Sequence, residues 1–509
     1  MKKSRVIYSL KNMSSGVAVY IVNIVLQFIN RVIFLKFLSV DYLGINGLFS
    51  NVLSMLNIAE LGIAGAMVYA LYKPISDNNI NELKSIMFLY KKLYRIVGFL
   101  VLGIGICLIP FLNYFINVDE VGNIAYLKVY FLLYVLDSGI SYFLSYKRSI
   151  IICDQQSYII NGTNLIRIIF TNIFQIAVLI LTQNYMCYLL VKVICTFGEN
   201  VFIHFIANKK YPFLKEKTEL PSKDITEKIK KNILAMSMHK IGYIVIFGTD
   251  NIIITKFVSL AATGLYSNYT LIINSITSLI TQLFSGLTAS VGNLLVEERE
   301  NKEQYIYNIY RNILFVNFCI YYVISIGIYM CIQNLIVLWI GDNYLLSREV
   351  VFCAVLSFFS LGMRKTISLF KDAGGLFWND RYKPLIESVS NLLLSIPLTM
   401  KFGIAGTLIG TIITNLFISG TIEAYITYKY LFKRNVFRYF AIEGLFYTIT
   451  ILSLLICGYM SEIISGNGIV EFIMRGGIAV FSSVTVIIIL FGRSAEFNYI
   501  KGMAKKILR

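Results

Sequence analysis

Long apolar runs follow one another along almost the whole chain, separated by short polar segments. Each run has about 20 residues, enough to span a bilayer as a helix. We predict helices at 16–38, 43–70, 96–116, 124–146, 158–181, 186–207, 233–258, 263–290, 312–336, 348–370, 384–401, 404–428, 440–463 and 470–492. The predicted fold class is an all-α integral membrane protein with about 14 transmembrane helices. A transmembrane barrel would alternate over segments of about ten residues instead.

The composition agrees with a membrane protein. The chain is 57% hydrophobic and 15% charged, whereas a soluble protein carries about 25% charged residues. The net charge of +18 comes from basic residues in short segments between apolar runs. No soluble basic domain is present, so the charge indicates membrane orientation and no nucleic-acid partner. The eight cysteines contain no CxxC pair, so neither a metal site nor a disulfide framework is expected.

The basic residues alternate with the predicted spans. On one side of the membrane, the connections and both termini contain nearly all the Lys and Arg residues found outside the spans. The connections on the opposite side carry only Lys401. We therefore expect both termini to be cytoplasmic. Four domains follow: a six-helix lobe at 1–208, a basic linker at 209–232, a second six-helix lobe at 233–430, and two additional helices with a basic tail at 431–509.

An internal repeat supports the two lobes. KFLSVDYLGINGLFSN (36–51) resembles KFVSLAATGLYSN (256–268), with a three-residue difference placed in the turn. Each copy ends one predicted helix and starts the next at the outer face. An even number of helices separates the copies, so both run the same way, a recurrent transporter plan.

Polar residues form a stripe on the first predicted helix. Asn23, Gln27, Asn30 and Arg31 follow i, i+4, i+7, i+8 spacing, which places them on one face. An arginine at a helix centre costs about 2.5–3.5 kcal/mol. The stripe should therefore face protein or a water-filled cavity. Hydrogen bonding between helices and substrate binding are both consistent with the amides.

Further charges lie within other predicted spans. Arg167, Lys240 beside His239, and Arg364 are candidate substrate-binding cations. Asp250 stands near the repeat-equivalent position of Arg31, so it could form an ion pair with it or bind a coupling ion. Asp137 and Glu60 could hold a proton or be buried structural acids. Lys192 and Glu199, on one helix, are expected to form a structural pair or network.

These spans contain more deep cations than acids that could neutralise them. A cationic cavity suits an anionic cargo such as a phosphate or diphosphate. The segment FKDAGGLFWNDRYKP adds Lys371, Arg381 and Lys383 at a predicted cytoplasmic loop. These residues either fix the loop or contact the diphosphate.

Two segments resemble a known family. TDNIIITKF…GLYSNYTLIINSI…GLTASVGNLL (249–295) and FKDAGGLFWNDRYKPLIESVSNLLLSIPL (370–398) are similar to the polysaccharide transporter, or Wzx-type oligosaccharide flippase, family. That family is a branch of the multidrug/oligosaccharidyl-lipid/polysaccharide (MOP) exporter superfamily. The resemblance implies two six-helix lobes around a cavity, two extra C-terminal helices and a location in the bacterial cytoplasmic membrane.

The resemblance also implies a function: moving an undecaprenyl-pyrophosphate-linked oligosaccharide across that membrane by alternating access, for surface polysaccharide biosynthesis. Coupling to H⁺ or Na⁺ is implied, and no cofactor. A polysaccharide polymerase and chain-length machinery are the protein partners to expect. The alternative is a cation-coupled multidrug exporter of the same superfamily. A membrane enzyme is disfavoured because the predicted outer loops are short and carry no HExxH, Walker A or GxGxxG motif.

Overall fold

A computed structural model describes residues 2–56, 60, 62–115, 126–154, 156–216, 218–233, 237, 249–296, 300–376, 379–463 and 468–507. Every regular element in these ranges is helical. The chain divides into two compact units, Met1–Gly264 and Leu265–Arg509. The four domain boundaries expected from the sequence stay a prediction.

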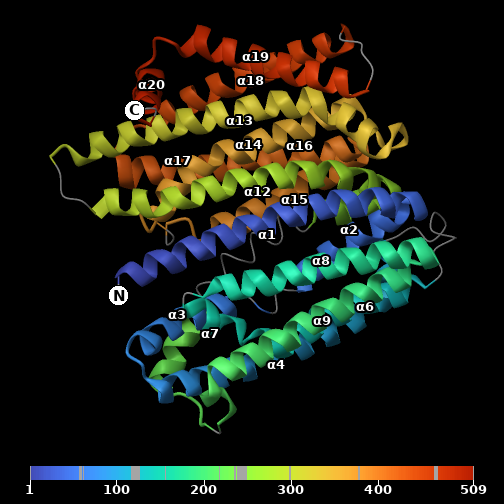
Figure 1. Ribbon diagram of the computed structural model, residues 1–509. Coiled ribbons are helices and arrows are strands. Elements are labelled where there is room, and N and C mark those ends of the chain that lie inside the picture. The colour runs from blue at the N-terminus through green and yellow to red at the C-terminus, as the bar shows by residue number, and fades with distance from the viewer. Residues whose placement is uncertain are drawn as a thin grey trace. The chain divides into compact units, whose positions relative to one another are not determined.

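The first unit is a bundle in which α1 lies along α8, and α4, α6 and α9 pack together (Figure 1). Its helices are α1 (Lys2–Phe37), α2 (Val40–Leu56), α3 (Ile63–Ser76), α4 (Ile80–Leu108), α5 (Leu112–Phe115), α6 (Leu127–Ser145), α7 (Arg148–Cys153), α8 (Ser157–Thr182), α9 (Tyr185–Lys210) and α11 (Asp250–Phe257). Two 3-10 turns, η2 (Ile109–Phe111) and η3 (Pro212–Lys215), follow α4 and α9.

In the second unit α13 is the central helix, and it packs against α14, α18 and α19 (Figure 1). The α-helices are α12 (Leu260–Val296), which begins in the first unit, α13 (Lys302–Ile340), α14 (Arg348–Ala373), α15 (Lys383–Phe402), α16 (Ile404–Thr414), α17 (Thr421–Thr427), α18 (Phe437–Ile463), α19 (Gly468–Phe491) and α20 (Ala495–Ile507). The short turns are η4 (Asp342–Tyr344), η5 (Asn415–Gly420) and η6 (Tyr428–Phe432).

The all-helical membrane fold is confirmed. Within the described residues, ten helices are long and apolar enough to cross a membrane, and the full count of about 14 stays a prediction. The predicted helix 43–70 is wrong, because α2 ends at Leu56 and α3 begins after Gly62, whose φ is 68°. The predicted helix 404–428 runs on to Phe432 and contains two π turns, η5 and η6. Of the predicted helix 233–258, residues 234–236 and 238–248 lie outside the described residues.

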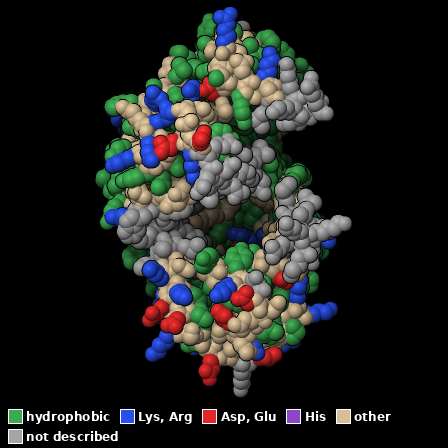
Figure 2. Space-filling model, turned by 90° about the vertical axis from the view of Figure 1, so that its left-hand side faces the viewer, with side chains coloured by type: hydrophobic (Ala, Val, Ile, Leu, Met, Phe, Trp, Pro, Cys, Tyr) green, Lys and Arg blue, Asp and Glu red, His purple; other side chains and the backbone are tan. Residues whose placement is uncertain are grey.

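The surface of both units is largely apolar along the helices. Large side chains such as Leu181, Phe481 and Ile489 are more than 70% exposed, as expected where lipid replaces water. Figure 2 looks at the left-hand end of Figure 1, where blue Lys and Arg and red Asp and Glu side chains reach the surface. Lys36 and Lys256 lie in the last turns of α1 and α11, so cations also occur at the predicted outer turns. The membrane orientation stays a prediction.

The two repeat copies pack against each other through glycines. A Cβ on Gly44 would lie 2.1 Å from the carbonyl oxygen of Leu260, and one on Gly264 would lie 2.3 Å from that of Val40. The two contacts are therefore equivalent: Gly44 packs against Leu260, and Gly264 packs against Val40. The equivalent of Gly264 is thus Gly44, with no gap. The three-residue difference placed in the turn from the sequence is wrong.

We expect Gly44→Ala and Gly264→Ala each to destabilise the protein by about 1–3 kcal/mol, the usual cost of overpacking. The obstacle is a backbone oxygen, which cannot rotate away as a side chain would. Gly103→Ala in α4 is the matched control, because nothing lies within 4 Å of a Cβ there and alanine favours the helix. The midpoint of thermal unfolding of the purified protein measures the difference. Equal midpoints for Gly44→Ala and Gly103→Ala would contradict the close packing.

Candidate substrate site

The polar stripe of α1 is divided between a buried and an exposed part. The amide of Asn30, 6% exposed, donates to Oδ1 of Asn172 at 2.9 Å and to Oε1 of Gln175 at 3.2 Å. It also accepts from the Tyr188 hydroxyl at 3.2 Å. Asn30 therefore holds α1 against α8 and α9, which is the helix-to-helix bonding anticipated for the amides.

The rest of the stripe is more accessible. Asn23 and Arg31 are half-buried and Gln27 is exposed. The guanidinium of Arg31 interacts electrostatically with Tyr188. Substrate binding by these residues stays a prediction.

A charged cluster in the first unit contains two arginines and one glutamate. Nε of Arg167 lies 2.8 Å and Nη2 of Arg148 lies 3.2 Å from the same oxygen, Oε2 of Glu199. Asn200 accepts from Arg148 at 2.9 Å, and Asn164 accepts from Arg167 at 2.7 Å. One carboxylate cannot neutralise two guanidinium groups, so this cluster carries a net positive charge.

The burial of this cluster is uneven. The side chain of Glu199 is 4% exposed, whereas those of Arg148 and Arg167 are 28% and 26% exposed. The acid is thus enclosed and the two guanidinium groups retain access to a ligand. Because arginine forms bidentate hydrogen bonds with phosphate, the cluster can bind an anionic head group.

The pairing of Lys192 with Glu199 expected from the sequence is wrong. Lys192 Nζ instead lies 3.5 Å from Oδ2 of Asp137 and 4.6 Å from the Tyr134 ring centroid. Arg148 was missed because it lies in a basic segment assigned to a loop. The signal that could have found it is the deep Glu199, which needs a cation from another helix.

Arg364 belongs to a buried ion network in the second unit. Its Nη1 lies 2.8 Å from Oε1 of Glu387, and its Nε lies 3.5 Å from Oε2 of Glu423. Asn415, in the π turn η5, accepts a further hydrogen bond at 2.7 Å. Arg364 is thus neutralised within its own unit, which makes it weaker as an anion ligand than Arg167.

The same network includes two of the loop lysines. Lys383 Nζ lies 2.5 Å from Oε1 of Glu423, and Lys371 is paired with Asp380 and lies 3.5 Å from Glu423. Both lysines are buried, so they join α14 and α15 to α17. This arrangement favours the loop-fixing alternative.

The guanidinium of Arg381 lies over the ring of Tyr382, 4.7 Å from the ring centroid. The cations of this network are balanced, because Glu387, Glu423 and Asp380 pair with Arg364, Lys371 and Lys383. These acids were not predicted as partners, because they lie on other segments than the cations they bind. The expected excess of deep cations over acids in the chain stays a prediction.

The three candidate coupling acids have different surroundings. Glu60 accepts hydrogen bonds from the hydroxyls of Tyr94 and Tyr142. Asp137 is paired with Lys192. Asp250 begins α11, and its Oδ1 is buried without a hydrogen-bond partner among the described residues. Lys240 and His239 lie outside the described residues. Ion coupling at these acids stays a prediction.

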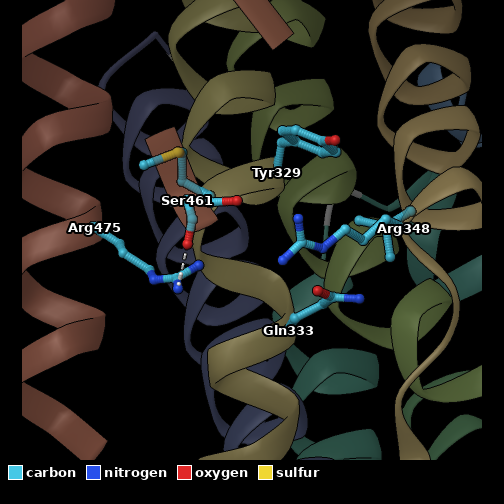
Figure 3. A pocket seen from close by; sticks show the side chains of 7 residues that line it. Tyr329, Gln333, Arg348, Ser461 and Arg475 are labelled. Atoms are coloured by element: carbon cyan, nitrogen blue, oxygen red, sulfur yellow. Dashed lines mark hydrogen bonds between the residues drawn. The ribbon is translucent and has the colours of Figure 1, made fainter. Parts of the chain in front are cut away.

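Arginines also line a small pocket in the second unit (Figure 3). It is formed by Tyr329, Met330, Gln333, Arg348, Val351, Ser461 and Arg475. Arg475 donates to the carbonyl oxygen of Ser461 at 2.9 Å and pairs with Glu471 at 2.6 Å. The pocket has room for about one water molecule, so it is too small for a sugar or a diphosphate.

Comparison with known proteins identifies the fold. No family model matches the sequence, and no curated protein matches it either. The structure of the lipid II flippase MurJ in an inward closed conformation matches 95% of this chain and 99% of that chain, with a TM-score of 0.63 at 15% identity.

Two transporters of the MOP superfamily also match. An inward-facing multidrug resistance MATE family transporter covers 81% of this chain and 94% of its own, with a TM-score of 0.59 at 13% identity. A transporter from Pyrococcus furiosus covers 85% and 97%, with a TM-score of 0.53 at 12% identity. The chain therefore has the fold of the MATE and MurJ transporters, as the resemblance in the sequence implied.

Proposed function

We propose that this chain is a flippase for a polyprenyl-diphosphate-linked oligosaccharide in the bacterial cytoplasmic membrane, and that it is not an enzyme. The observation that carries the proposal is the net positive Arg148–Glu199–Arg167 cluster in a chain whose fold resembles that of a lipid II flippase. The buried glutamate holds both guanidinium groups in place, and a diphosphate supplies the missing negative charge.

Transport by alternating access requires a site that binds the head group differently in its two states. In our proposal the arginines of the cluster draw the diphosphate into the protein from the cytoplasm, while the polyprenyl tail stays in lipid. Arg31 is the proposed later contact, and Asp250, Asp137 or Glu60 the proposed proton or Na⁺ site. Arg364 is assigned a structural role instead, because its charge is already balanced.

The test is surface polysaccharide export in cells that lack the chromosomal gene and express variants. We expect Arg148→Ala and Arg167→Ala each to lower export at least tenfold, because each removes a charge-assisted contact. Arg438→Ala, which removes an exposed arginine of the second unit, is the matched control and should export normally. Protein amounts in the membrane must be equal for the comparison. Normal export by both cluster variants would refute the proposed site.

A cation-coupled multidrug exporter is the second candidate, favoured by the match to a MATE family transporter. Such an exporter would need negative charge for cationic drugs. Glu199, Glu387 and Glu423 are each paired with cations, which leaves Glu60 and Asp250 as candidate acids for that role. Drug susceptibility of the same cells discriminates. Restoration of drug resistance with no restoration of polysaccharide export would favour the exporter.

A further inference from the structure

A buried lysine at one end of the first unit has no acidic partner among the described residues. Lys147 follows α6 and precedes α7, and only 3% of it is exposed. Its Nζ contacts Oδ1 of Asn208 and lies 3.3 Å from Nε2 of His204. Both partners are neutral groups of α9, so nothing in this set balances the ammonium charge.

Three acids on or beside the neighbouring elements α7, α9 and η3 are engaged elsewhere. Asp154 accepts from Tyr211 at 2.7 Å, Glu199 is paired with Arg148 and Arg167, and Glu216 is paired with Lys84 at 2.6 Å. A buried ammonium without a counter-charge is strongly destabilising. The position of Lys147 is therefore unfavourable unless something outside the chain neutralises it.

Further positive charges converge on the same place. Lys91 from α4 and Lys215 from η3 are close enough to repel Lys147, and burial together with this repulsion lowers the pKa of Lys147 to about 8. Helices α4 and α9 both pack against η3, and α7 packs against α9. Arg148 of α7 is directed to Glu199 instead.

The histidine provides a second unsatisfied group. Nδ1 of His204 is buried and has no hydrogen-bond partner within the described part of the chain. A buried polar atom without a partner costs free energy comparable to a lost hydrogen bond. Lys147, His204 and Asn208 are thus in contact, and Lys91 and Lys215 add positive charge from α4 and η3, which pack against each other.

We propose that Lys147, His204, Lys91 and Lys215 form a binding site for a phosphate group, carried by an anionic lipid head group or by free phosphate. The anion would accept hydrogen bonds from the ammonium groups and neutralise the buried Lys147. The proposed site shares no residue with the Arg148–Glu199–Arg167 cluster, although the two are neighbours: Lys147 precedes Arg148, and His204 follows Glu199 by five residues on α9. Failure of this proposal would leave the flippase proposal unchanged.

The experiment uses the full-length protein, purified in an uncharged detergent and phosphate-free buffer. The midpoint of thermal unfolding is measured while either sodium phosphate or phosphatidylglycerol is added, with sodium chloride at equal ionic strength and phosphatidylcholine as references. We expect at least one of the two phosphate ligands to raise the midpoint of the wild type above its reference. Stabilisation by phosphatidylglycerol alone assigns the site to lipid, and stabilisation by both assigns it to the phosphate group itself.

Variants locate the effect. Lys147→Met should bind at least tenfold more weakly, and without ligand it should be more stable than the wild type, because it removes an unneutralised buried charge. A role limited to the hydrogen bond with Asn208 predicts the opposite, a loss of stability. Lys92→Met, an exposed lysine of α4, is the control with the same change in net charge. If Lys147→Met does not fold, Lys215→Met replaces it in the test. Lys215 is exposed, so this variant should weaken phosphate binding without altering the buried Lys147.

Two results would overturn the proposal. One is the absence of any ligand-induced shift in the wild type with either phosphate ligand. The other is an equal shift in the wild type, Lys147→Met and Lys215→Met, which would place the anion elsewhere.

The pH dependence of stability gives an independent check. The folded-state pKa of Lys147 is about 8, below the ordinary value of 10.5, so between these values the unfolded chain binds more protons than the folded one. This group therefore makes the folded state more stable as the pH rises from about 8 to 10. In ligand-free buffer the stability advantage of Lys147→Met over the wild type should shrink over that range. A constant difference would contradict the lowered pKa.

Discussion

Glu423→Gln should destabilise the second unit by about 3–5 kcal/mol, the range measured when one partner of a buried ion pair is removed. Glu423 is 1% exposed and lies 2.5 Å from Lys383 and 3.5 Å from both Arg364 and Lys371. It also accepts from the Ser368 hydroxyl at 2.6 Å. The substitution preserves shape but leaves Arg364, Lys371 and Lys383 with Glu387, Asp380 and the more exposed Asp372 as their acidic partners among the described residues.

Two further variants make this expectation specific. Glu303→Gln removes a surface pair with Lys433, in which both side chains are about half exposed or more, and should cost no more than about 1 kcal/mol. The double variant Glu423→Gln/Lys383→Met removes one charge of each sign and should recover much of the loss. Unfolding midpoints or the yield of folded protein in membranes measure all three. Equal effects of Glu423→Gln and Glu303→Gln would show that the network contributes no more than a surface pair.

The helices and the polar face of α1 were predictable from the sequence because they depend on local patterns. Apolar runs of membrane length define most of α8, α9, α14, α18 and α19. The spacing of Asn30 along α1 indicates a face that needs partners. A hydropathy average hides single residues, however, so it could not locate the start of α3, where Gly62 adopts a left-handed conformation with φ 68°.

The charge partners were not predictable because they come from segments far apart in the chain. Arg364 looked like a free cavity cation, yet its partners Glu387 and Glu423 lie on other helices. Lys192 lies two turns from Glu199 on the same helix, yet Glu199 is bound by arginines of α7 and α8. A single sequence shows that a buried charge needs a partner, but not which partner reaches it. The same limit applies to Gly44, whose register with Gly264 depends on contact between the two copies.

The first unit offers a matching test of charge balance, with a smaller expected effect. Glu199→Gln should cost about 2–4 kcal/mol, between the values for buried and surface pairs, because Arg148 and Arg167 keep about a quarter of their exposure. Unfolding midpoints should show that Arg148→Met/Glu199→Gln is more stable than Glu199→Gln alone, since one unbalanced guanidinium replaces two.

Anion binding by the two arginines predicts a second effect, a shift of the unfolding midpoint on addition of pyrophosphate. An ion pair with a purely structural role would not produce this shift. With the carboxylate gone, the two arginines gain affinity for an external anion, so pyrophosphate should raise the unfolding midpoint of Glu199→Gln more than that of the wild type. It should stabilise Arg148→Met/Glu199→Gln less than Glu199→Gln, because one of the two cations is missing. Glu303→Gln, which changes the net charge equally, should respond to pyrophosphate like the wild type. If Glu199→Gln also responded no more than the wild type, the two arginines would be structural partners of Glu199 and the diphosphate would have to bind elsewhere.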